Sequence, residues 1–206
     1  MKKIFTSFLI IFSVFAFNNV KAGEFFDFEN KYIRFGIGSS KSKIDYSFDG
    51  NAYYFDAKFK EDSTPTILVG IGTEYKNFDI STNFKYQYYK LNNNNKVSVA
   101  TISFDGNYLF RNSTIFSPYI GAGLNVNSFS VELGNDTYDN AVVALAYRAG
   151  LLINIKDNID IDLNIQQTTK SDCFEEDIYF IDLRDYGRLK GEYRDTSINL
   201  NLLFRF

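Results

Sequence analysis

The sequence contains no histidine, so the commonest acid–base residue and metal ligand is missing. Ser-His-Asp and Cys-His nucleophile arrangements are excluded with it. The single cysteine, Cys173, cannot form an internal disulfide or a zinc site of cysteines, although its thiol could pair between molecules. We therefore expect no catalytic residues, no cofactor site and no metal site, and no enzyme. One arrangement stays open, a site of carboxylates alone, and its candidates are Asp177, Asp182 and Asp185.

Tryptophan is also absent, yet 22 Phe and 15 Tyr make 18% of the chain aromatic. Basic residues are outnumbered, with 22 Lys plus Arg against 25 Asp plus Glu, which argues against a nucleic-acid partner. After residue 22 the chain has no apolar run of about 18 residues, so it has no candidate membrane-spanning helix. The aromatic residues must therefore serve a fold of another kind.

Residues 1–22 have the pattern of a secretory signal peptide. Lys2 and Lys3 form a positive start, residues 4–17 are mostly apolar, and small residues near Ala22 suit a signal peptidase. The apolar run is short for a transmembrane anchor. Cleavage would remove three lysines and no acid, lowering the net charge from −3 to −6. We expect an exported product covering residues 23–206.

The exported part alternates between apolar and polar residues with a period of two, which predicts β-strands. In the first segment Ile33, Phe35 and Ile37 alternate with Arg34 and Gly36. Eight segments follow this rule, and they cover residues 32–38, 67–75, 78–88, 101–110, 119–126, 143–154, 159–166 and 197–206. Four leucines break the rule by falling on the polar side: Leu68, Leu109, Leu152 and Leu203.

The two faces of these strands predict a membrane barrel. One face carries large apolar residues without charge, and the other carries Gly, Asn, Ser and charged residues. The interior of an eight-stranded barrel is too narrow for the bulky face, which must point outward. Only lipid makes that tolerable, and a closed barrel satisfies every backbone hydrogen bond there. We predict an all-β domain over residues 23–206: an eight-stranded antiparallel up-and-down transmembrane β-barrel. A soluble lipid-binding barrel is disfavoured because its lumen would be polar.

The connections between the predicted strands alternate in length. They are residues 41–63, 76–77, 91–96, 111–117, 130–140, 156–158 and 170–192. Long loops outside the cell and short periplasmic turns are typical of outer-membrane barrels. The connections at the two ends of the chain follow this rule well, whereas 91–96 and 111–117 follow it poorly.

Two stretches resemble a known family. The segment Phe116-Ser117-Pro118-Tyr119-Ile120-Gly121-Ala122-Gly123 is similar to the Pro-Tyr-x-Gly-x-Gly stretch of small outer-membrane β-barrels, the porin-like family that includes opacity-type proteins and the barrel of outer membrane protein A. Residues 146–150 resemble the family's next strand. The family often places Trp in its interfacial girdle, and here aromatic residues such as Tyr75, Phe78, Tyr88 and Tyr108 would have to replace it.

The resemblance implies a location and partners. It places the chain in the outer membrane of a Gram-negative bacterium, in contact with outer-membrane lipid and lipopolysaccharide, as a structural surface protein that presents extracellular loops. The last strand, ending in Phe204 and Phe206, resembles the insertion signal that the barrel-assembly machinery reads. The oligomeric state is left open.

Charged residues on the polar face would lie in the lumen of the barrel. We predict a network of nine: Arg34, Glu74, Asp79, Lys85, Asp105, Arg148, Asp160, Asp162 and Arg205. Buried charges must be paired, so these residues are expected to fill the barrel with salt bridges. The alternative is a narrow pore for small solutes, although eight strands leave little free bore.

The two longest connections, 41–63 and 170–192, are rich in aromatic residues. Tyrosines are favoured in recognition surfaces, so a candidate binding surface consists of Tyr46, Tyr53, Tyr54, Tyr179 and Tyr186. On this hypothesis the protein is an adhesin or immune-evasion protein that binds a host or matrix molecule. The other interpretation is that strands continue beyond the membrane, because residues 42–48 and 53–59 alternate around a turn signal at Asp49-Gly50-Asn51.

Overall fold

The computed structural model describes residues 30–50, 54–59, 63–92, 95–133, 136–180 and 185–206. The predicted signal peptide at 1–22 lies outside them. The strands are β1 (Asn30–Gly50), β2 (Tyr54–Phe59), β3 (Thr64–Tyr75), β4 (Phe78–Asn92), β5 (Asn95–Leu109), β6 (Phe116–Leu133), β7 (Asp136–Lys156), β8 (Ile159–Thr168), β9 (Ser171–Phe180) and β10 (Asp185–Arg205). In this described part of the chain, no helix is long and apolar enough to cross a bilayer.

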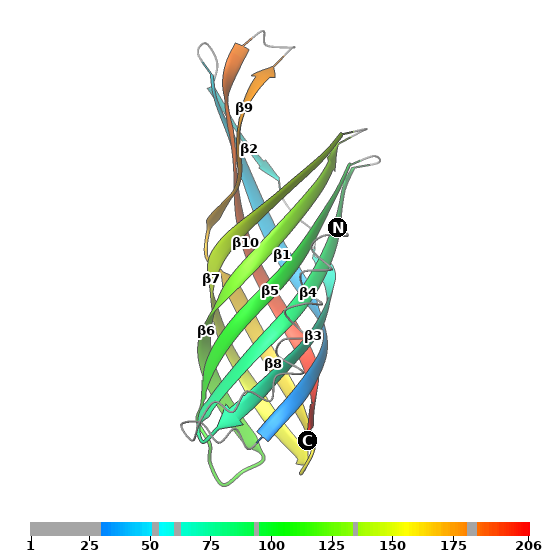
Figure 1. Ribbon diagram of the computed structural model, residues 1–206, viewed down its shortest axis with the longest axis vertical. Coiled ribbons are helices and arrows are strands. Elements are labelled where there is room, and N and C mark those ends of the chain that lie inside the picture. Colours follow the sequence, from blue (N-terminus) through cyan, green and yellow to red (C-terminus); the bar gives the residue numbers. More distant parts are fainter. Residues whose placement is uncertain (1–29, 51–53, 60–62, 93–94, 134–135, 181–184) are drawn as a thin grey trace, which may run out of the picture.

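Eight of the strands close into a barrel. Every neighbouring pair is antiparallel, in the order β1-β3-β4-β5-β6-β7-β8-β10. The barrel closes where β10 returns to β1, in a register that runs from Tyr32 opposite Arg205 to Gly50 opposite Gly187. Figure 1 shows the resulting tilted cylinder. The prediction of an eight-stranded antiparallel barrel is confirmed.

The remaining two strands extend the barrel at one end. β2 pairs with the outer part of β1, and β9 pairs with the outer part of β10. Since β1 and β10 also pair there, the four strands form a sheet in the order β2-β1-β10-β9, which stands above the rim in Figure 1. We call it the outer sheet. The end of the barrel that carries it is the hairpin end, and the opposite end is the turn end.

The long connections predicted from the sequence are mostly strand. Only residues 93–94 separate β4 from β5, and only 134–135 separate β6 from β7, so the loops predicted at 91–96 and 130–140 are wrong. The connections predicted at 41–63 and 170–192 are also mostly strand, because β1, β2, β9 and β10 occupy most of them. The alternative interpretation, that strands continue over residues 42–48 and 53–59, is confirmed by the antiparallel pairing of β1 with β2. Polar residues continue the backbone pairing of these strands past the apolar stretch. The pattern of apolar residues therefore predicts strands that are too short.

The two faces of the wall lie as the alternation predicts. Apolar side chains point outward and are strongly exposed, among them Ile37 at 65% and Ile67 at 63%. Polar and charged side chains point inward and are buried, for example Gln87 and Asp162 at 0%. The leucines that break the alternation also point inward, and each of Leu68, Leu109, Leu152 and Leu203 is buried.

Candidate functional site: the charged lumen

Glycines on the inner face make room for two large tyrosines. Tyr32 on β1 lies opposite Gly72 on β3, and Tyr119 on β6 lies opposite Gly150 on β7. A Cβ atom on Gly72 would come within 2.3 Å of the Tyr32 ring, and one on Gly150 within 2.5 Å of the Tyr119 ring. Each ring therefore lies flat across its neighbour's backbone, which directs its hydroxyl into the lumen.

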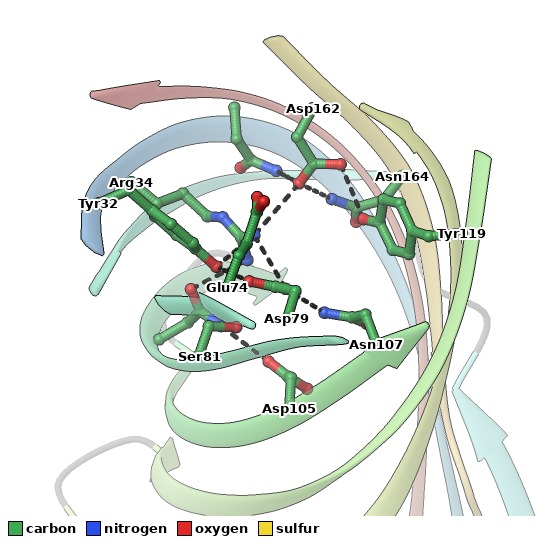
Figure 2. Close-up of polar contacts among 12 residues, drawn as sticks. Tyr32, Arg34, Glu74, Asp79, Ser81, Asp105, Asn107, Tyr119, Asp162 and Asn164 are labelled. Carbon is green, nitrogen blue, oxygen red and sulfur yellow. Dashed lines mark hydrogen bonds and ion pairs between the residues drawn. The ribbon is translucent and has the colours of Figure 1, made fainter. Parts of the chain in front are cut away.

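These tyrosines take part in the central cluster, which we define as Arg34, Asp79 and Asp162 with Tyr32 and Tyr119 (Figure 2). The Arg34 Nη2 atom lies 3.9 Å from Asp79 Oδ2 and 3.8 Å from Asp162 Oδ2. Tyr32 donates a hydrogen bond of 2.5 Å to Asp79, and Tyr119 donates one of 2.7 Å to Asp162. One cation thus joins two carboxylates from β4 and β8, and each carboxylate is also held by a tyrosine.

Asparagine side chains satisfy the remaining carboxylate oxygens of the central cluster. Asn107 donates to Asp79 at 2.6 Å. Asn164 and Asn201 donate to Asp162 Oδ2 at 2.9 and 2.8 Å. Hydrogen bonds to a charged acceptor are the stronger ones, and a buried charge needs several of them. The asparagines of the polar face therefore offset part of the cost of burying these charges.

A second ion pair lies against the β5–β7 side of the barrel. Arg148 Nη2 is 2.8 Å from Asp105 Oδ2, and both side chains are buried. Ser103 and Asn83 each donate to the same carboxylate at 2.7 Å. Asp105 therefore receives three donors, and its charge is balanced within the wall.

The hairpin-end cluster is built around Asp195, which the sequence analysis did not select. Lys85 Nζ lies 2.8 Å from Asp195 Oδ2. Gln87 and Ser42 donate to the same carboxylate at 3.2 and 2.9 Å, and Ser40 donates as well. Asp195 was not predicted as a lumen residue because it lies between the predicted loop 170–192 and the predicted strand 197–206. Continuing the alternation of Asn201, Asn199 and Ser197 by one step would have found it.

The turn-end cluster closes the other side. Arg205 donates to Glu74 at 2.7 Å and to Asp160 at 2.5 Å. Arg111 also pairs with Glu74, and it lies in the connection 110–115 rather than in a strand. Sequence reasoning missed Arg111 because residues 111–117 were predicted to be a turn.

Buried apolar and aromatic side chains also contribute to filling the lumen. Tyr32, Leu109, Tyr119, Leu152 and Leu203 form one buried cluster. A second contains Tyr89, Val97, Val99, Phe129 and Tyr193, and lies towards the hairpin end. The cavity beside the central cluster measures about 10 Å³, roughly the space of one water molecule. A larger recess of about 590 Å³ opens at the turn end, where Lys76, Arg111 and Arg205 contribute to its lining.

The structure thus places all nine predicted lumen residues inside the barrel and divides them into four groups. Arg34, Asp79 and Asp162 share the central cluster, Arg148 pairs with Asp105, Lys85 pairs with Asp195, and Glu74, Asp160 and Arg205 meet at the turn end. Within the described residues, no group of His, Cys, Asp and Glu has an arrangement that could hold a metal ion.

The other predicted residues lie on the outer wall or in the outer sheet. Phe204 is 41% exposed and packs edge-on against Phe35, with ring centroids 6.3 Å apart, and Phe206 is 74% exposed. The tyrosines proposed for binding are in strands: Tyr46 in β1, Tyr54 in β2, Tyr179 in β9 and Tyr186 in β10. Tyr53 lies outside the described residues.

Comparison with known proteins identifies the family. Residues 7–206 match the model of the outer membrane protein beta-barrel domain. The chain belongs to this family. Strands that extend far beyond the barrel are typical of the extracellular side of outer-membrane barrels, so we assign the hairpin end, which carries the outer sheet, to the outside of the cell and the turn end to the periplasm. No curated protein matches the chain by sequence.

Solved structures of this kind of barrel have the same fold at low sequence identity. OprG from Pseudomonas aeruginosa has a TM-score of 0.63 and 12% identity, over 86% of this chain and 95% of its own. Neisserial surface protein A has a TM-score of 0.61 and 15% identity, over 85% of this chain and 97% of its own. The attachment invasion locus protein Ail of Yersinia pestis has a TM-score of 0.50 and 15% identity, over 85% and 98%.

Proposed function

We propose that this outer-membrane barrel is a structural, surface-exposed protein with a closed lumen, and that it presents the outer sheet to the surroundings of the cell. The observation that carries the proposal is the filling of the lumen by paired charges. Every predicted lumen carboxylate has a cation within 4 Å, and two buried clusters of apolar and aromatic side chains fill further parts of the lumen. Residues 1–22 would export the chain as a signal peptide, and Phe204 and Phe206 would present the last strand to the barrel-assembly machinery.

A pore and an enzyme are both less well supported. The cavity of about 10 Å³ beside Arg34 is too small for any solute larger than water. The lumen carboxylates are held by cations and amides, so none has the free geometry that a general base needs. A structural function requires only that the barrel is closed and that its charges are satisfied.

Gel mobility and conductance test this proposal together. Protein from the outer-membrane fraction should migrate faster on a denaturing gel before boiling than after it, as folded barrels do. The same protein in a planar bilayer should give no regular conductance steps. Steps that change in size with Arg148→Ala or Lys85→Ala would contradict the closed lumen and establish a pore.

An adhesin is the second candidate, because the outer sheet is a large surface held outside the membrane. Its terminal strands, β2 and β9, each pair on one side only among the described residues. An exposed strand edge can add a strand from a partner, with backbone hydrogen bonds giving affinity. The names of two structural relatives, a surface protein and an attachment protein, agree with such a role.

Shortening the outer sheet tests the adhesin hypothesis. One variant replaces residues 46–57 and 175–190 by Asn-Gly turns, which keeps Asp45 opposite Lys58 and Phe174 opposite Gly191. The matched control replaces residues 132–137 of the β6–β7 hairpin in the same way. Cells carrying each variant are tested for binding to host matrix and serum proteins. Binding that is lost only in the first variant makes the protein an adhesin, whereas equal binding removes this candidate.

A further inference from the structure

The recess at the turn end is lined mainly by cations. Its described lining contains four cations and a single acid, which are Lys76, Arg111, Lys156, Arg205 and Asp157. Even when the two carboxylates behind the arginines, Glu74 and Asp160, are counted, cations outnumber acids by four to three. The chain as a whole has a net charge of −3, so the recess reverses the overall charge locally. An anion is therefore the kind of ligand that this recess favours.

Glu74 orients both arginines of the recess. Its side chain is buried, and it accepts hydrogen bonds from Arg205 at 2.7 Å and from Arg111. Arg205 Nε also donates to Asp160. Arg111 Nε donates to the backbone oxygen of Lys76 at 3.1 Å. The Nη1 atom of each arginine makes no hydrogen bond to the described residues, so both fixed guanidinium groups keep donors that suit the oxygens of a phosphate.

Lys76 has a backbone conformation that is unusual for a lysine. It begins the two-residue turn between β3 and β4, and its φ of 53° lies in the left-handed region. Such turns favour Asn or Gly, because other side chains are strained there. The Lys76 side chain has no ion-pair partner among the described residues, and its Nζ atom lies 5.2 Å from the centroid of the Tyr75 ring. The turn alone does not explain a lysine here, whereas an anion in the recess does.

A β-bulge brings consecutive residues of β7 to the recess. The pairing of β7 with β8 shifts between Asn154 and Lys156, which leaves Ile155 without an opposite residue. In a regular strand only alternate residues share a face, yet Asn154, Ile155 and Lys156 all contribute to the lining. Bulges often re-aim a side chain next to a functional site. Lys156 is exposed and has no ion-pair partner among the described residues, so its charge is available to a ligand.

We propose that the recess binds a soluble phosphorylated sugar or polyol in the periplasm. The phosphate group lies among the two arginines and the two lysines. The recess measures about 590 Å³, a volume typical of sites for small organic molecules, and a bare phosphate fills only a small part of it. The amides of Asn30 and Asn154 also line it and can form hydrogen bonds with hydroxyl groups. This inference goes beyond the proposed function, and binding at the turn end needs no path through the barrel.

A soluble ligand fits this position better than a lipid headgroup. Both arginines are held from the lumen side, by Glu74 and Asp160, which are buried inside the barrel. The apolar surface that acyl chains cover is the other face of the same strands. A phosphate attached to a lipid has to leave its bilayer to enter the mouth of the barrel, whereas a soluble one diffuses in. Lipid-borne phosphate is therefore the alternative that the experiment has to exclude.

Binding of glucose 6-phosphate to the purified, folded protein tests this inference. The isotope-labelled protein is kept in neutral detergent micelles, and its amide resonances are followed while the sugar phosphate is added. The test variant combines Lys76→Asn and Lys156→Gln, which removes the two unpaired lysines and leaves the arginines with their carboxylates. The matched control combines Lys41→Gln and Lys43→Gln, two exposed cations near the hairpin end. Heat-modifiable gel mobility verifies that each variant is folded.

We expect the double variant to bind glucose 6-phosphate roughly 25-fold more weakly, since each lysine contributes about fivefold, the upper range for an exposed ion pair. The control should bind like the unchanged protein, and resonance changes should concentrate at the β3–β4 turn and the end of β7. Glucose, which lacks the phosphate, should change no resonances. Equal affinity of the double variant and the unchanged protein, or an equal loss in the control, would overturn the inference.

The single variant Lys76→Asn separates binding from folding, and it serves if the double variant does not fold. Asparagine suits the left-handed turn better than lysine, so this variant should be at least as stable in a urea titration as the unchanged protein. Its affinity for glucose 6-phosphate should nevertheless fall by about fivefold. A stable variant with full affinity would show that Lys76 takes no part in binding and would contradict the inference.

Two further ligands separate the possible sources of the phosphate. Phosphatidic acid carries the same phosphate monoester on acyl chains, and a small fraction of it in the micelles should change no resonances of the recess. Changes there, with displacement of glucose 6-phosphate, would overturn the inference in favour of a lipid headgroup. Inorganic phosphate should bind more weakly than glucose 6-phosphate, and equal binding would mean that the sugar is not recognised. None of these outcomes touches the closed lumen, which the conductance measurement tests separately.

Discussion

The inner and outer faces of the barrel wall are made by the same strands but stabilise the fold in different ways. Inside, each charged side chain has particular partners, as Asp162 has Arg34, Tyr119 and two asparagines. Outside, residues such as Ile37 and Val143 need only an apolar surrounding. Hydrogen bonds and ion pairs are directional and costly when left unmade, whereas contact with lipid is not directional. The inner face should therefore tolerate substitution far less than the outer face.

The largest difference in unfolding free energy between the two faces is expected when one cation is removed from each face of β1. Arg34→Met leaves Asp79 and Asp162 buried without their shared cation, which should cost about 3–5 kcal/mol of unfolding free energy. Lys31→Met removes an exposed cation from the same strand and should cost less than about 1 kcal/mol. Urea titration of the protein in vesicles, followed by gel mobility without boiling, measures both. Equal losses would show that the central cluster contributes nothing particular to stability.

A methyl group added to each face should give a smaller difference in unfolding free energy. Gly150→Ala places its Cβ against the ring and hydroxyl of Tyr119, so the ring must move and its hydrogen bond to Asp162 weakens. We expect a loss of about 1–3 kcal/mol, typical of overpacking in a tight interior. Gly106 faces outward, and the nearest atom to a Cβ there is a backbone oxygen at 3.9 Å, so Gly106→Ala should be nearly neutral. The same urea titration compares the two, and a neutral Gly150→Ala would mean that the tyrosine is not held in place by its glycine.

The difference between the faces also explains what could be predicted from the sequence. The apolar residues of the outer face follow one simple rule, and residues such as Ile33, Phe35 and Ile37 revealed the strands and the barrel directly. The inner face follows the same period, so Arg34 and Asp162 could be placed in the lumen. Their pairing could not be predicted, because it depends on barrel register and tilt, which bring β1, β4 and β8 to one point.

The extracellular part shows the limit of this reasoning most clearly. Past the membrane neither face has to be apolar. Residues 42–48 and 53–59 still alternate and indicated strands, whereas the last strand appeared to begin only near residue 197. The backbone pairing nevertheless continues to Gly50 opposite Gly187. Asp195 was missed in this region, although it is the partner of Lys85. Backbone hydrogen bonds extend these strands, and they require no particular pattern of apolar side chains in the sequence.

The smallest effect is expected for an aromatic residue on the outer face that has directional contacts. Tyr108 lies edge-on to two phenylalanines in the periplasmic girdle, with ring centroids 5.3 Å from Phe78 and 5.2 Å from Phe110. Such pairs contribute about 0.5–1.5 kcal/mol beyond their apolar area. Tyr108→Leu should therefore lower the unfolding free energy by about this amount in the urea titration.

Tyr147→Leu is the matched control for the girdle, because Tyr147 is 57% exposed on the same outer face and makes no ring contact among the described residues. It should change the unfolding free energy by a few tenths of a kcal/mol at most, the usual scale for an exposed substitution. If both substitutions cost the same, the outer face has no directional interactions and its aromatic residues act only through their apolar area. If Tyr108→Leu costs as much as Arg34→Met, the girdle is as specific as the lumen and the contrast between the two faces is wrong.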